Sequence, residues 1–357
     1  MLILLVVGVA AVVYSAIRRR RELLALPPSR LGPYKIGKKL GEGGMGAVFE
    51  ARHDCLGRRT ALKLIKPARR DPDSEARFDR EARLTSELVH PNTVALYEYG
   101  RTEDGVRYYA MELVEGLTLS ELVRREGPLP SGRVLGILRQ IAASLAHAHA
   151  RGLVHRDIKP SNVMLCHREG HPDCVKVVDF GLAKRMDAID AAASLAGMQV
   201  GTPEFMAPEA VDDPASVGPE TDVYATGILA YALLTGSTPF EGCDLAQMVR
   251  AHRLVPPLPP SARRAEDMPR DLERVVLTCL AKRPLDRFAD GAALLEALDA
   301  CSPIASWSAE HAERWWRALD LEGRGASPAR DPAPTTRRDR LLLSSTFPLR
   351  RRATSSG

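Results

Sequence analysis

The period of the hydrophobic positions changes several times along the chain, and each change marks a different predicted element. Between Ser74 and Leu88 apolar residues recur at helical spacing, with Ser74 as a candidate N-cap and Pro91 shortly after the end. Elsewhere apolar residues form short β-type runs, which favour strands of a sheet. These runs lie at 34–36, 47–51, 60–65 and 175–178. The pattern predicts three strands, then a helix, with a further strand in the middle of the chain.

A longer apolar run opens the chain and predicts a membrane anchor. Residues 2–17 carry no charge, and arginines occupy 18–21. As a helix the run would span about 24 Å of the roughly 30 Å hydrocarbon core, a gap that snorkelling arginines and local thinning close. A cleaved signal peptide is the alternative, but its basic segment would precede the apolar run. We expect a single-pass anchor over 1–21 in the inner or plasma membrane, a juxtamembrane linker over 22–33, and the rest on the cytoplasmic side.

A glycine-rich segment over 40–48 has the form G-x-G-x-x-G-x-V. It consists of Leu40, Gly41, Glu42, Gly43, Gly44, Met45, Gly46, Ala47 and Val48. The spaced glycines let the backbone approach phosphate groups with no Cβ in the way. The same spacing occurs in dinucleotide-binding folds, where a helix follows the loop. Here β-type runs lie on both sides, which favours a phosphate-covering loop between two strands.

Two ionisable residues lie in the next predicted elements. Lys63, in the run Thr60–Ile65, fits a V-A-I-K strand and is expected to contact the α- and β-phosphates of a nucleotide. The alternative, a lysine that protects a sheet edge, is outweighed by the spacing after the glycine segment. Glu81 lies next to the inward stripe of the predicted helix and is the candidate ion-pair partner of Lys63; otherwise it is a solvated glutamate. That stripe consists of Phe78, Ala82, Thr85 and Leu88.

The segment 155–162, His-Arg-Asp-Ile-Lys-Pro-Ser-Asn, fits the pattern H-R-D-x-x-x-x-N. Phosphoryl transfer to a hydroxyl needs a carboxylate that accepts the hydroxyl proton, which fits Asp157. It also needs a cation near the transferred phosphate, which fits Lys159, and an amide oxygen for a magnesium ion, which fits Asn162. Downstream, Asp-Phe-Gly begins at Asp179, a further magnesium ligand, and an A-P-E motif ends the segment Gly-Thr-Pro-Glu-Phe-Met-Ala-Pro-Glu.

From about Tyr34 to Cys301 the chain resembles the Hanks-type (eukaryotic-like) Ser/Thr protein kinases, in particular the bacterial ones. The amino-acid sequences of the glycine segment, of the H-R-D segment and of the segment ending in A-P-E are typical of that group. The resemblance implies an α+β, two-lobed protein-kinase fold that binds ATP and Mg²⁺ between its lobes. The small antiparallel β lobe with one helix would cover 34–111, the hinge 112–116, and the large helical lobe 117–301.

The resemblance also implies roles for single residues. Met111 would be the gatekeeper, Glu112 to Val114 the adenine-contacting hinge, Asp222 a buried brace for the catalytic loop, and Arg287 the partner of Glu209. The implied catalytic residues are Asp157, Lys159, Lys63 and Glu81. The implied ATP-binding residues are Leu40, Gly41, Glu42, Gly43, Gly44, Met45, Gly46, Val48, Ala61, Lys63, Met111, Glu112, Val114, Asn162 and Asp179, with Asn162 and Asp179 as metal ligands.

The expected reaction is transfer of the γ-phosphoryl group of Mg-ATP to Ser or Thr hydroxyls of substrate proteins. A pseudokinase scaffold is the nearest alternative, but no residue that carries the chemistry departs from the pattern. A small-molecule kinase would generally lack the protein-substrate platform that the A-P-E segment implies, and Lys159-Pro160-Ser161 disfavours tyrosine specificity.

Ser194 and Thr202 are the candidate phosphorylation sites, because they carry the only hydroxyls between Asp179 and Glu209. In the resembling family a phosphorylated residue of this segment meets the arginine of the H-R-D motif, so we expect phosphorylated Ser194 to pair with Arg156. Thr202 is expected to hydrogen-bond within the active site. A homodimer would allow autophosphorylation in trans.

Composition adds limits to this interpretation. The 357 residues are 45% hydrophobic, which suits a globular core, and the net charge of +5 gathers at the two ends, so no nucleic-acid groove is expected. Six cysteines without a paired framework fit a reducing cytosol. The motif Cys166-His167-x-x-x-His171-x-x-Cys174 has zinc-binding residue types but falls on a predicted hairpin turn, too cramped for four ligands.

A tryptophan-containing helix is expected over 302–322, packed on the large lobe or docking a partner, and a disordered tail over 323–357.

Overall fold

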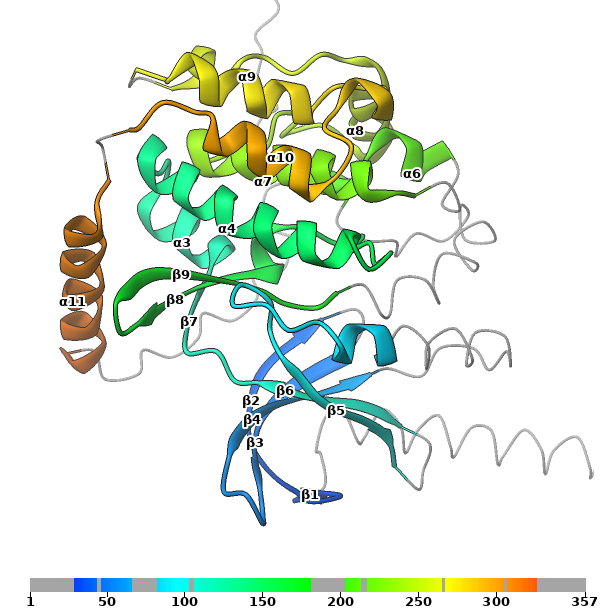
Figure 1. Cartoon of the computed structure of the whole chain (residues 1–357), viewed down its shortest axis with the longest axis vertical. Helices are drawn as coiled ribbons and strands as arrows, with labels where there is room; N and C mark the ends of the chain where they lie inside the picture. Colours follow the sequence, from blue (N-terminus) through cyan, green and yellow to red (C-terminus); the bar gives the residue numbers. More distant parts are fainter. Residues whose placement is uncertain are drawn as a thin grey trace, which may run out of the picture. The chain divides into compact units, whose positions relative to one another are not determined.

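The computed structural model describes residues 29–43, 46–65, 82–102, 106–180, 203–212, 217–264, 267–304 and 307–325. The chain divides into two compact units, residues 1–314 and 315–357. The described part of the second unit is the last portion of helix α11 (Ala309–Gly325), where the rings of Trp315 and Trp316 meet edge to face at 5.0 Å. The first unit contains the two lobes described below (Figure 1).

The small lobe is an antiparallel six-stranded sheet with the strand order β1-β2-β3-β4-β6-β5. Its strands are β1 (Arg30–Leu31), β2 (Tyr34–Gly43), β3 (Gly46–His53), β4 (Arg59–Ile65), β5 (Leu96–Arg101) and β6 (Arg107–Glu112). The strands predicted at 34–36, 47–51 and 60–65 are confirmed; β2 and β3 extend by several residues beyond their apolar runs, and β4 by one residue. Strands β2 and β3 form the hairpin that carries the glycine-rich segment at its tip.

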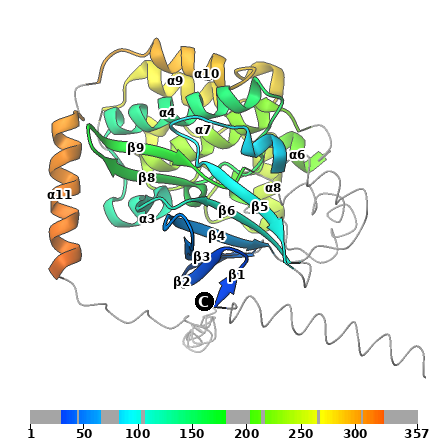
Figure 2. The ribbon, with the colours of Figure 1, turned by 60° about the horizontal axis from the view of Figure 1, so that its bottom comes forward.

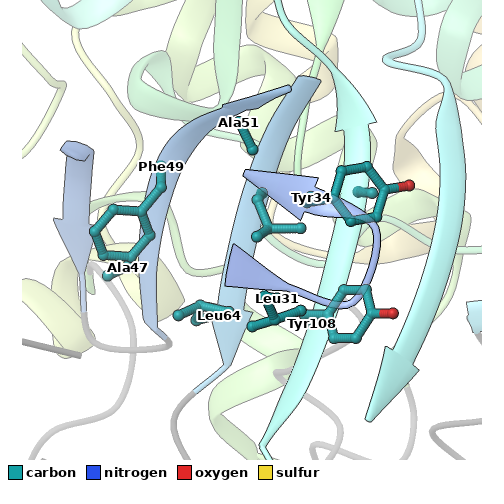
Figure 3. Packing of buried hydrophobic residues seen from close by; sticks show 9 residues of the cluster. Leu31, Tyr34, Ala47, Phe49, Ala51, Leu64 and Tyr108 are labelled. Atoms are coloured by element: carbon teal, nitrogen blue, oxygen red, sulfur yellow. The ribbon is translucent and has the colours of Figure 1, made fainter. Parts of the chain in front are cut away.

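Alternation along these strands gives the sheet a buried face of its own. A cluster of aromatic and aliphatic side chains covers that face (Figure 3). It consists of Leu31, Tyr34, Ala47, Phe49, Ala51, Leu62, Leu64, Tyr108 and Ala110. The hydroxyls of Tyr34 and Tyr108 both donate to the Glu98 carboxylate, at 2.7 and 3.0 Å, so the polar ends of two buried rings are paired.

The predicted helix over 74–88 is described only in its last part. Residues 82–86 are helical, and Ala82, Thr85 and Leu88 are buried, as the inward stripe predicts. Phe78 and Glu81 lie outside the described residues. The chain then turns at Pro91, in accord with the predicted end of the helix.

The large lobe is mainly helical and carries a three-stranded sheet of order β7-β8-β9. Its strands are β7 (Gly116–Thr118), β8 (Val163–Arg168) and β9 (His171–Val177). Its helices are α3 (Leu119–Glu126), α4 (Ser131–His149), η1 (Pro160–Asn162), η2 (Pro203–Phe205), α6 (Pro208–Asp212), α7 (Pro219–Thr235), α8 (Leu245–Leu254), η3 (Pro260–Arg263), α9 (Arg270–Cys279), η4 (Pro284–Asp286) and α10 (Gly291–Asp299). Helix α7 is apolar and buried over nearly its whole length, as a central core helix requires. The proline-rich stretch 256–259 is a loop between α8 and η3.

The β8–β9 hairpin lies between the small-lobe sheet and the large-lobe helices (Figure 2). Main-chain bonds tie it to the segment after the small-lobe helix: Val94 N–H donates to the Val177 carbonyl at 3.0 Å, and Val177 N–H to that of Asn92 at 2.8 Å. The Asn92 amide also donates to the Val175 carbonyl at 3.0 Å. Through these hydrogen bonds the hairpin connects the large lobe to the segment that leads into the small-lobe strand β5.

The helix expected over 302–322 begins later, because Ala309 is the first residue of α11 and Trp307 lies in the approach to it. Ser308 accepts hydrogen bonds from Ala312 N–H through its carbonyl and from His311 N–H through its hydroxyl, which starts the helix there. Trp307 packs on the large lobe: its indole N–H donates to Asp173 at 2.9 Å, and the Arg133 guanidinium lies 4.4 Å from its ring. For Trp307 the predicted packing on the large lobe is confirmed.

Within the residues that the structure describes, none of the helices is long and apolar enough to cross a membrane. The predicted anchor at 2–17 lies outside them.

Candidate active site

The H-R-D segment places a carboxylate, an ammonium group and an amide side by side. Asp157 Oδ2 lies 2.9 Å from Lys159 Nζ and accepts a 2.9 Å hydrogen bond from Asn162 Nδ2. The same amide nitrogen donates to the Asp157 main-chain carbonyl at 2.9 Å. The short turn η1 carries Asn162 back toward Asp157, so three residues predicted from one sequence motif form one polar cluster.

A buried aspartate from α7 fixes the backbone beside this cluster. Asp222 accepts a hydrogen bond from the main-chain N–H of His155 at 2.6 Å and from that of Arg156 at 2.7 Å. Arg156 has a φ of 66°, a conformation that residues with a side chain rarely adopt. The carboxylate therefore holds a strained turn of the loop in place. The predicted brace by Asp222 is confirmed.

His149, at the end of α4, makes a contact that no sequence motif indicates. Its Nε2 lies 2.9 Å from Asp222 Oδ2, while its Nδ1 accepts from the Gly291 N–H at 3.0 Å. Because Nδ1 is an acceptor, the proton belongs on Nε2, and a neutral imidazole donates to Asp222. The fully buried carboxylate thus has three donors, which offsets the cost of its burial.

His155 connects the catalytic loop to the Asp-Phe-Gly segment. Its Nδ1 accepts from the Asp157 N–H at 3.2 Å, its Nε2 donates to the Val178 carbonyl at 3.0 Å, and its ring centroid lies 4.6 Å from that of Phe180. Burial lowers the pKa of His155 below its ordinary value, despite the opposing carboxylates of Asp222 and Asp157. The imidazole is therefore neutral at pH 7 and acts as a packing and hydrogen-bonding element.

Lys63 and Asp179 meet between the lobes. Lys63, on β4, lies with its Nζ 2.8 Å from Asp179 Oδ2 at the exit of β9. Asp179 has a φ of 60°, so the chain turns sharply where this carboxylate is presented. Glu81, the candidate partner of Lys63, lies outside the described residues. The contact joins the predicted lysine of the small lobe to the predicted metal ligand of the large lobe.

The glycine-rich segment forms the β2–β3 hairpin, with Gly41 paired to Val48 and Gly43 to Gly46. At Gly46 (φ 157°) an added Cβ would lie 1.9 Å from the Leu64 carbonyl oxygen of β4, so only glycine fits this close approach. At Gly41 and Gly43 a Cβ would meet nothing within 4 Å. Leu40 and Glu42 are exposed beside them. Gly44 and Met45 lie outside the described residues.

The predicted hinge begins at the end of β6. Ala61 of β4 pairs with Met111 of β6, and Thr60 pairs with Glu112, the last residue of β6. Val114 lies in no strand or helix, and within the described part of the chain its main-chain N–H and C=O make no hydrogen bond. Both groups are therefore available to a ligand that carries a donor and an acceptor on one edge.

Glu112 also makes cross-lobe ion pairs that no sequence motif predicts. Lys176 of β9 donates to its Oε2 at 2.9 Å, and Arg168 of β8 pairs with its Oε1. Burial alone would raise the pKa of Glu112, but Lys176 and Arg168 outweigh it and hold the pKa below its ordinary value. A half-buried carboxylate with two cations ties the start of the hinge to the β8–β9 hairpin.

The A-P-E segment is anchored by a buried ion pair. Both Arg287 η-nitrogens donate to the Glu209 carboxylate, at 2.8 and 2.9 Å, and the Thr221 hydroxyl donates to it at 2.8 Å. The predicted Glu209–Arg287 pair is confirmed. Ser194 and Thr202 lie outside the described residues.

Known proteins resemble this chain over most of the residues described above. The family model for the protein kinase domain matches residues 34–298. The serine/threonine-protein kinase pkn3 of Myxococcus xanthus is 40% identical over 271 residues, which are 75% of this chain and 49% of that protein. The serine/threonine-protein kinase PknB of Mycobacterium tuberculosis is 35% identical over 329 residues, which are 88% of this chain and 52% of that protein.

The match to pkn3 covers 49% of that protein and the match to PknB 52%, so the chain spans about half the length of these curated relatives. Among solved structures, the PknI kinase domain of Mycobacterium tuberculosis superposes with a TM-score of 0.59 at 28% identity, covering 76% of this chain and 96% of that one. The likeness confirms the two-lobed fold, with a β-rich small lobe and a helical large lobe. With the family model matched from Tyr34 onward and bacterial relatives above 30% identity, the chain belongs to the protein kinase family, alongside Hanks-type bacterial Ser/Thr kinases.

Proposed function

We propose that this protein is an ATP-dependent serine/threonine protein kinase that transfers the γ-phosphoryl group to hydroxyls of substrate proteins. The observation that carries the proposal is the convergence of Asp157, Lys159 and Asn162 in one cluster and of Lys63 and Asp179 in a second. The five groups are those that phosphoryl transfer requires. Lys63 lies on β4, Asp179 follows β9, and Asp157, Lys159 and Asn162 lie in the one segment that ends in η1.

The donor atoms fit magnesium and ATP. The Asn162 amide nitrogen is used by Asp157, which leaves its oxygen for a metal ion, and Asp179 adds a carboxylate. Magnesium prefers oxygen ligands and takes only one or two from a protein, with the rest from water and phosphate. When bound, it would neutralise charge on the phosphates. The unpaired main-chain groups of Val114 suit the edge of an adenine ring.

Each side chain then has one task. Asp157 orients the substrate hydroxyl and accepts its proton, and the Asn162 amide holds Asp157 by one hydrogen bond to its carboxylate and one to its main-chain carbonyl. Lys159 places a positive charge beside the oxygen that attacks, and Lys63 contacts the α- and β-phosphates. The Asp222 carboxylate keeps the main chain of His155 and Arg156 fixed, so that Asp157 does not reorganise during the reaction.

Phosphate transfer from radiolabelled ATP tests the proposal. We expect the wild type to label itself or a basic protein on Ser and Thr, and Asp157→Asn to lose at least about 100-fold in rate, the lower range for a general base. The matched control is Asp286→Asn, the same change at an aspartate whose side chain is 54% exposed. Nucleotide binding without transfer in the wild type would instead support a pseudokinase scaffold, the second candidate.

We further propose that residues 1–21 anchor the protein in the membrane, that 22–33 form a linker, and that the kinase domain covers 34–301 on the cytoplasmic side. The uncharged run 2–17 followed by arginines supports this. Flotation with liposomes of the full chain, beside a variant with Leu and Val residues of 2–17 changed to Ser, tests the anchor. Recovery of both in the soluble fraction would contradict it.

Autophosphorylation at Ser194, in trans within a homodimer, is proposed from two features of the sequence. Ser194 lies between the D-F-G and A-P-E motifs, and in the resembling family a phosphorylated residue of this segment meets the arginine of the H-R-D motif, here Arg156. Phosphopeptide mapping of the active enzyme tests it, with Ser194→Ala as the variant. A fully active enzyme with unmodified Ser194 would refute this part, and the kinase assignment would stand.

A further inference from the structure

Two cysteines face each other on the β8–β9 hairpin, outside the groups that the proposed reaction uses. Cys166 and Cys174 are direct cross-strand partners in the antiparallel pairing. The Cys166 thiol donates to the Cys174 carbonyl at 3.3 Å. They belong to the motif with zinc-binding residue types, so the structure tests what that motif does.

The histidines of the motif do not complete a metal site with these thiols. His167 Nε2 lies 3.2 Å from the Glu313 carboxylate, on the opposite side of the strand from Cys166 by the alternation of a strand. Among the residues described, no group of three or more His, Cys, Asp or Glu side chains is arranged to hold a metal ion. What the hairpin presents is a pair of thiols.

The surroundings of the pair favour a reactive thiolate. The neighbouring Cys166 thiol lowers the pKa of the Cys174 thiol, burial opposes this, and the charges of Arg168, Lys176 and His171 lower it further. Cys174 is partly exposed, whereas Cys166 is buried. A partly exposed thiolate among cations, next to a second thiol, is the arrangement of a redox-active cysteine with its resolving partner.

The pair also lies beneath the hinge. Cys166 pairs with Gly116 of β7, and a Cβ on Gly116 would lie 3.0 Å from the Cys166 Cβ. The cations beside the thiols, Arg168 and Lys176, are the ones that hold Glu112. Both ends of the hinge, Glu112 and Gly116, therefore contact the dithiol or its neighbouring cations.

We propose that Cys166 and Cys174 form a reversible disulfide, a modification site on the hairpin through which a peroxide lowers the affinity of the hinge for nucleotide. The Cys174 thiolate attacks one peroxide oxygen and releases hydroxide, which gives a sulfenic acid at Cys174. The Cys166 sulfur then attacks the Cys174 sulfur, the S–S bond forms and water leaves. Two thiols are oxidised by two electrons, and one hydrogen peroxide is reduced to two waters.

The geometry accounts for reversibility and for the effect on the hinge. Cross-strand Cβ atoms lie about 4.5–5.5 Å apart, whereas a disulfide requires about 3.5–4.5 Å. The bond therefore draws the strands together by up to about 1 Å, and a strained bond of this kind is easily reduced. The movement displaces Cys166 under Gly116 and removes the anion beside Arg168 and Lys176, so their contacts with Glu112 change.

The test treats the full chain with a small excess of hydrogen peroxide, maps disulfides by peptide mass spectrometry, and measures the binding of a fluorescent ATP analogue. We expect a bond between Cys166 and Cys174, and a Kd raised about fivefold, equivalent to about 1 kcal/mol at roughly 1.4 kcal/mol per tenfold. Dithiothreitol should restore both. Cys174→Ser should show neither change, and Cys55→Ser, the control at an exposed cysteine, should behave as wild type.

The outcomes separate cleanly. Oxidation that maps to other cysteines, with the 166–174 thiols intact, overturns the modification site. A mapped 166–174 disulfide with unchanged nucleotide affinity overturns the regulation of the hinge. The regulatory part rests on the proposed kinase function, but the disulfide does not. A reduced chain that binds no nucleotide would therefore count against the kinase proposal, while the peptide map still decides the modification site.

Discussion

The Glu209–Arg287 ion pair is the most informative place to perturb the large lobe. The Arg287 side chain is fully buried, and its N–H groups have partners throughout. Nε donates to the Ala281 carbonyl, and the two η-nitrogens donate to Glu209 and to the carbonyls of Glu220 and Lys282, all at 2.8–3.0 Å. Removing the Glu209 carboxylate leaves the buried Arg287 guanidinium with only the main-chain carbonyls to stabilise its charge.

The expected loss follows from this geometry. Breaking a buried ion pair by removing one partner costs about 3–5 kcal/mol. The three carbonyl contacts remain and the Glu209 side chain is 13% exposed, so we place Glu209→Ala at the lower end, about 3 kcal/mol. Glu209→Gln keeps one acceptor and the shape, and we expect about 1.5–2 kcal/mol because hydrogen bonds to charged groups are worth about that much.

Urea unfolding followed by circular dichroism measures these changes, with the slope m checked for constancy. The control is Asp286→Ala, which removes the carboxylate of an exposed pair with Arg283, 4.0 Å apart, and should cost under about 1 kcal/mol. The double variant Glu209→Leu with Arg287→Met should recover much of the loss, since no buried charge is left. A loss below about 1 kcal/mol in Glu209→Ala would refute the assignment of Arg287 as a buried charge dependent on its partner.

Three further predictions concern Glu209, Asp222 and Trp307. The ion pair with Arg287 lowers the pKa of Glu209, so the pair contributes its full stability above the unfolded pKa of about 4.3 and loses it as pH falls through the folded pKa. Glu209→Gln should therefore lose less unfolding free energy in acid than the wild type. Parallel curves of unfolding free energy against pH for the two proteins would contradict this prediction. Asp222→Ala should lower kcat about 100-fold with little change in nucleotide Kd, because Asp157 loses its position. A fall in kcat matched by an equal fall in nucleotide affinity would indicate unfolding instead. Trp307→Ala should lower the free energy of unfolding in urea by about 2 kcal/mol and Trp307→Phe by about half as much. Phenylalanine keeps a ring over Arg133 but lacks the indole N–H that donates to Asp173. Equal losses in the two variants would contradict a role for that N–H.

Local sequence patterns were sufficient for the elements that carry the motifs. The β2, β3 and β4 strands follow from short apolar runs, and the compact cluster of Asp157, Lys159 and Asn162 lies within one octapeptide, where η1 alone brings the side chains together. The contacts of Asp222 and Arg287 lie far along the chain from their partners, and they were anticipated only through the resemblance to a family.

The contacts of His149, Lys176 and Arg168 illustrate what local patterns do not contain. A histidine at the end of α4 and a lysine in β9 have ordinary environments by sequence, and a buried lysine in an apolar strand gives no indication of its partner. Their roles depend on Asp222 and Glu112, which approach them only after α4 packs against α7 and the hairpin meets the hinge.

By itself, the sequence determined the family, the strands β2, β3 and β4 and the candidates for the reacting groups, because each depends on residues that are neighbours along the chain. Only the tertiary structure decided that Lys63 meets Asp179, that Glu112 is held by two cations of the large lobe, and that Cys166 faces Cys174 beneath the hinge. These are contacts between elements, set by strand register and by the packing of one lobe on the other. No periodicity within a single element specifies them.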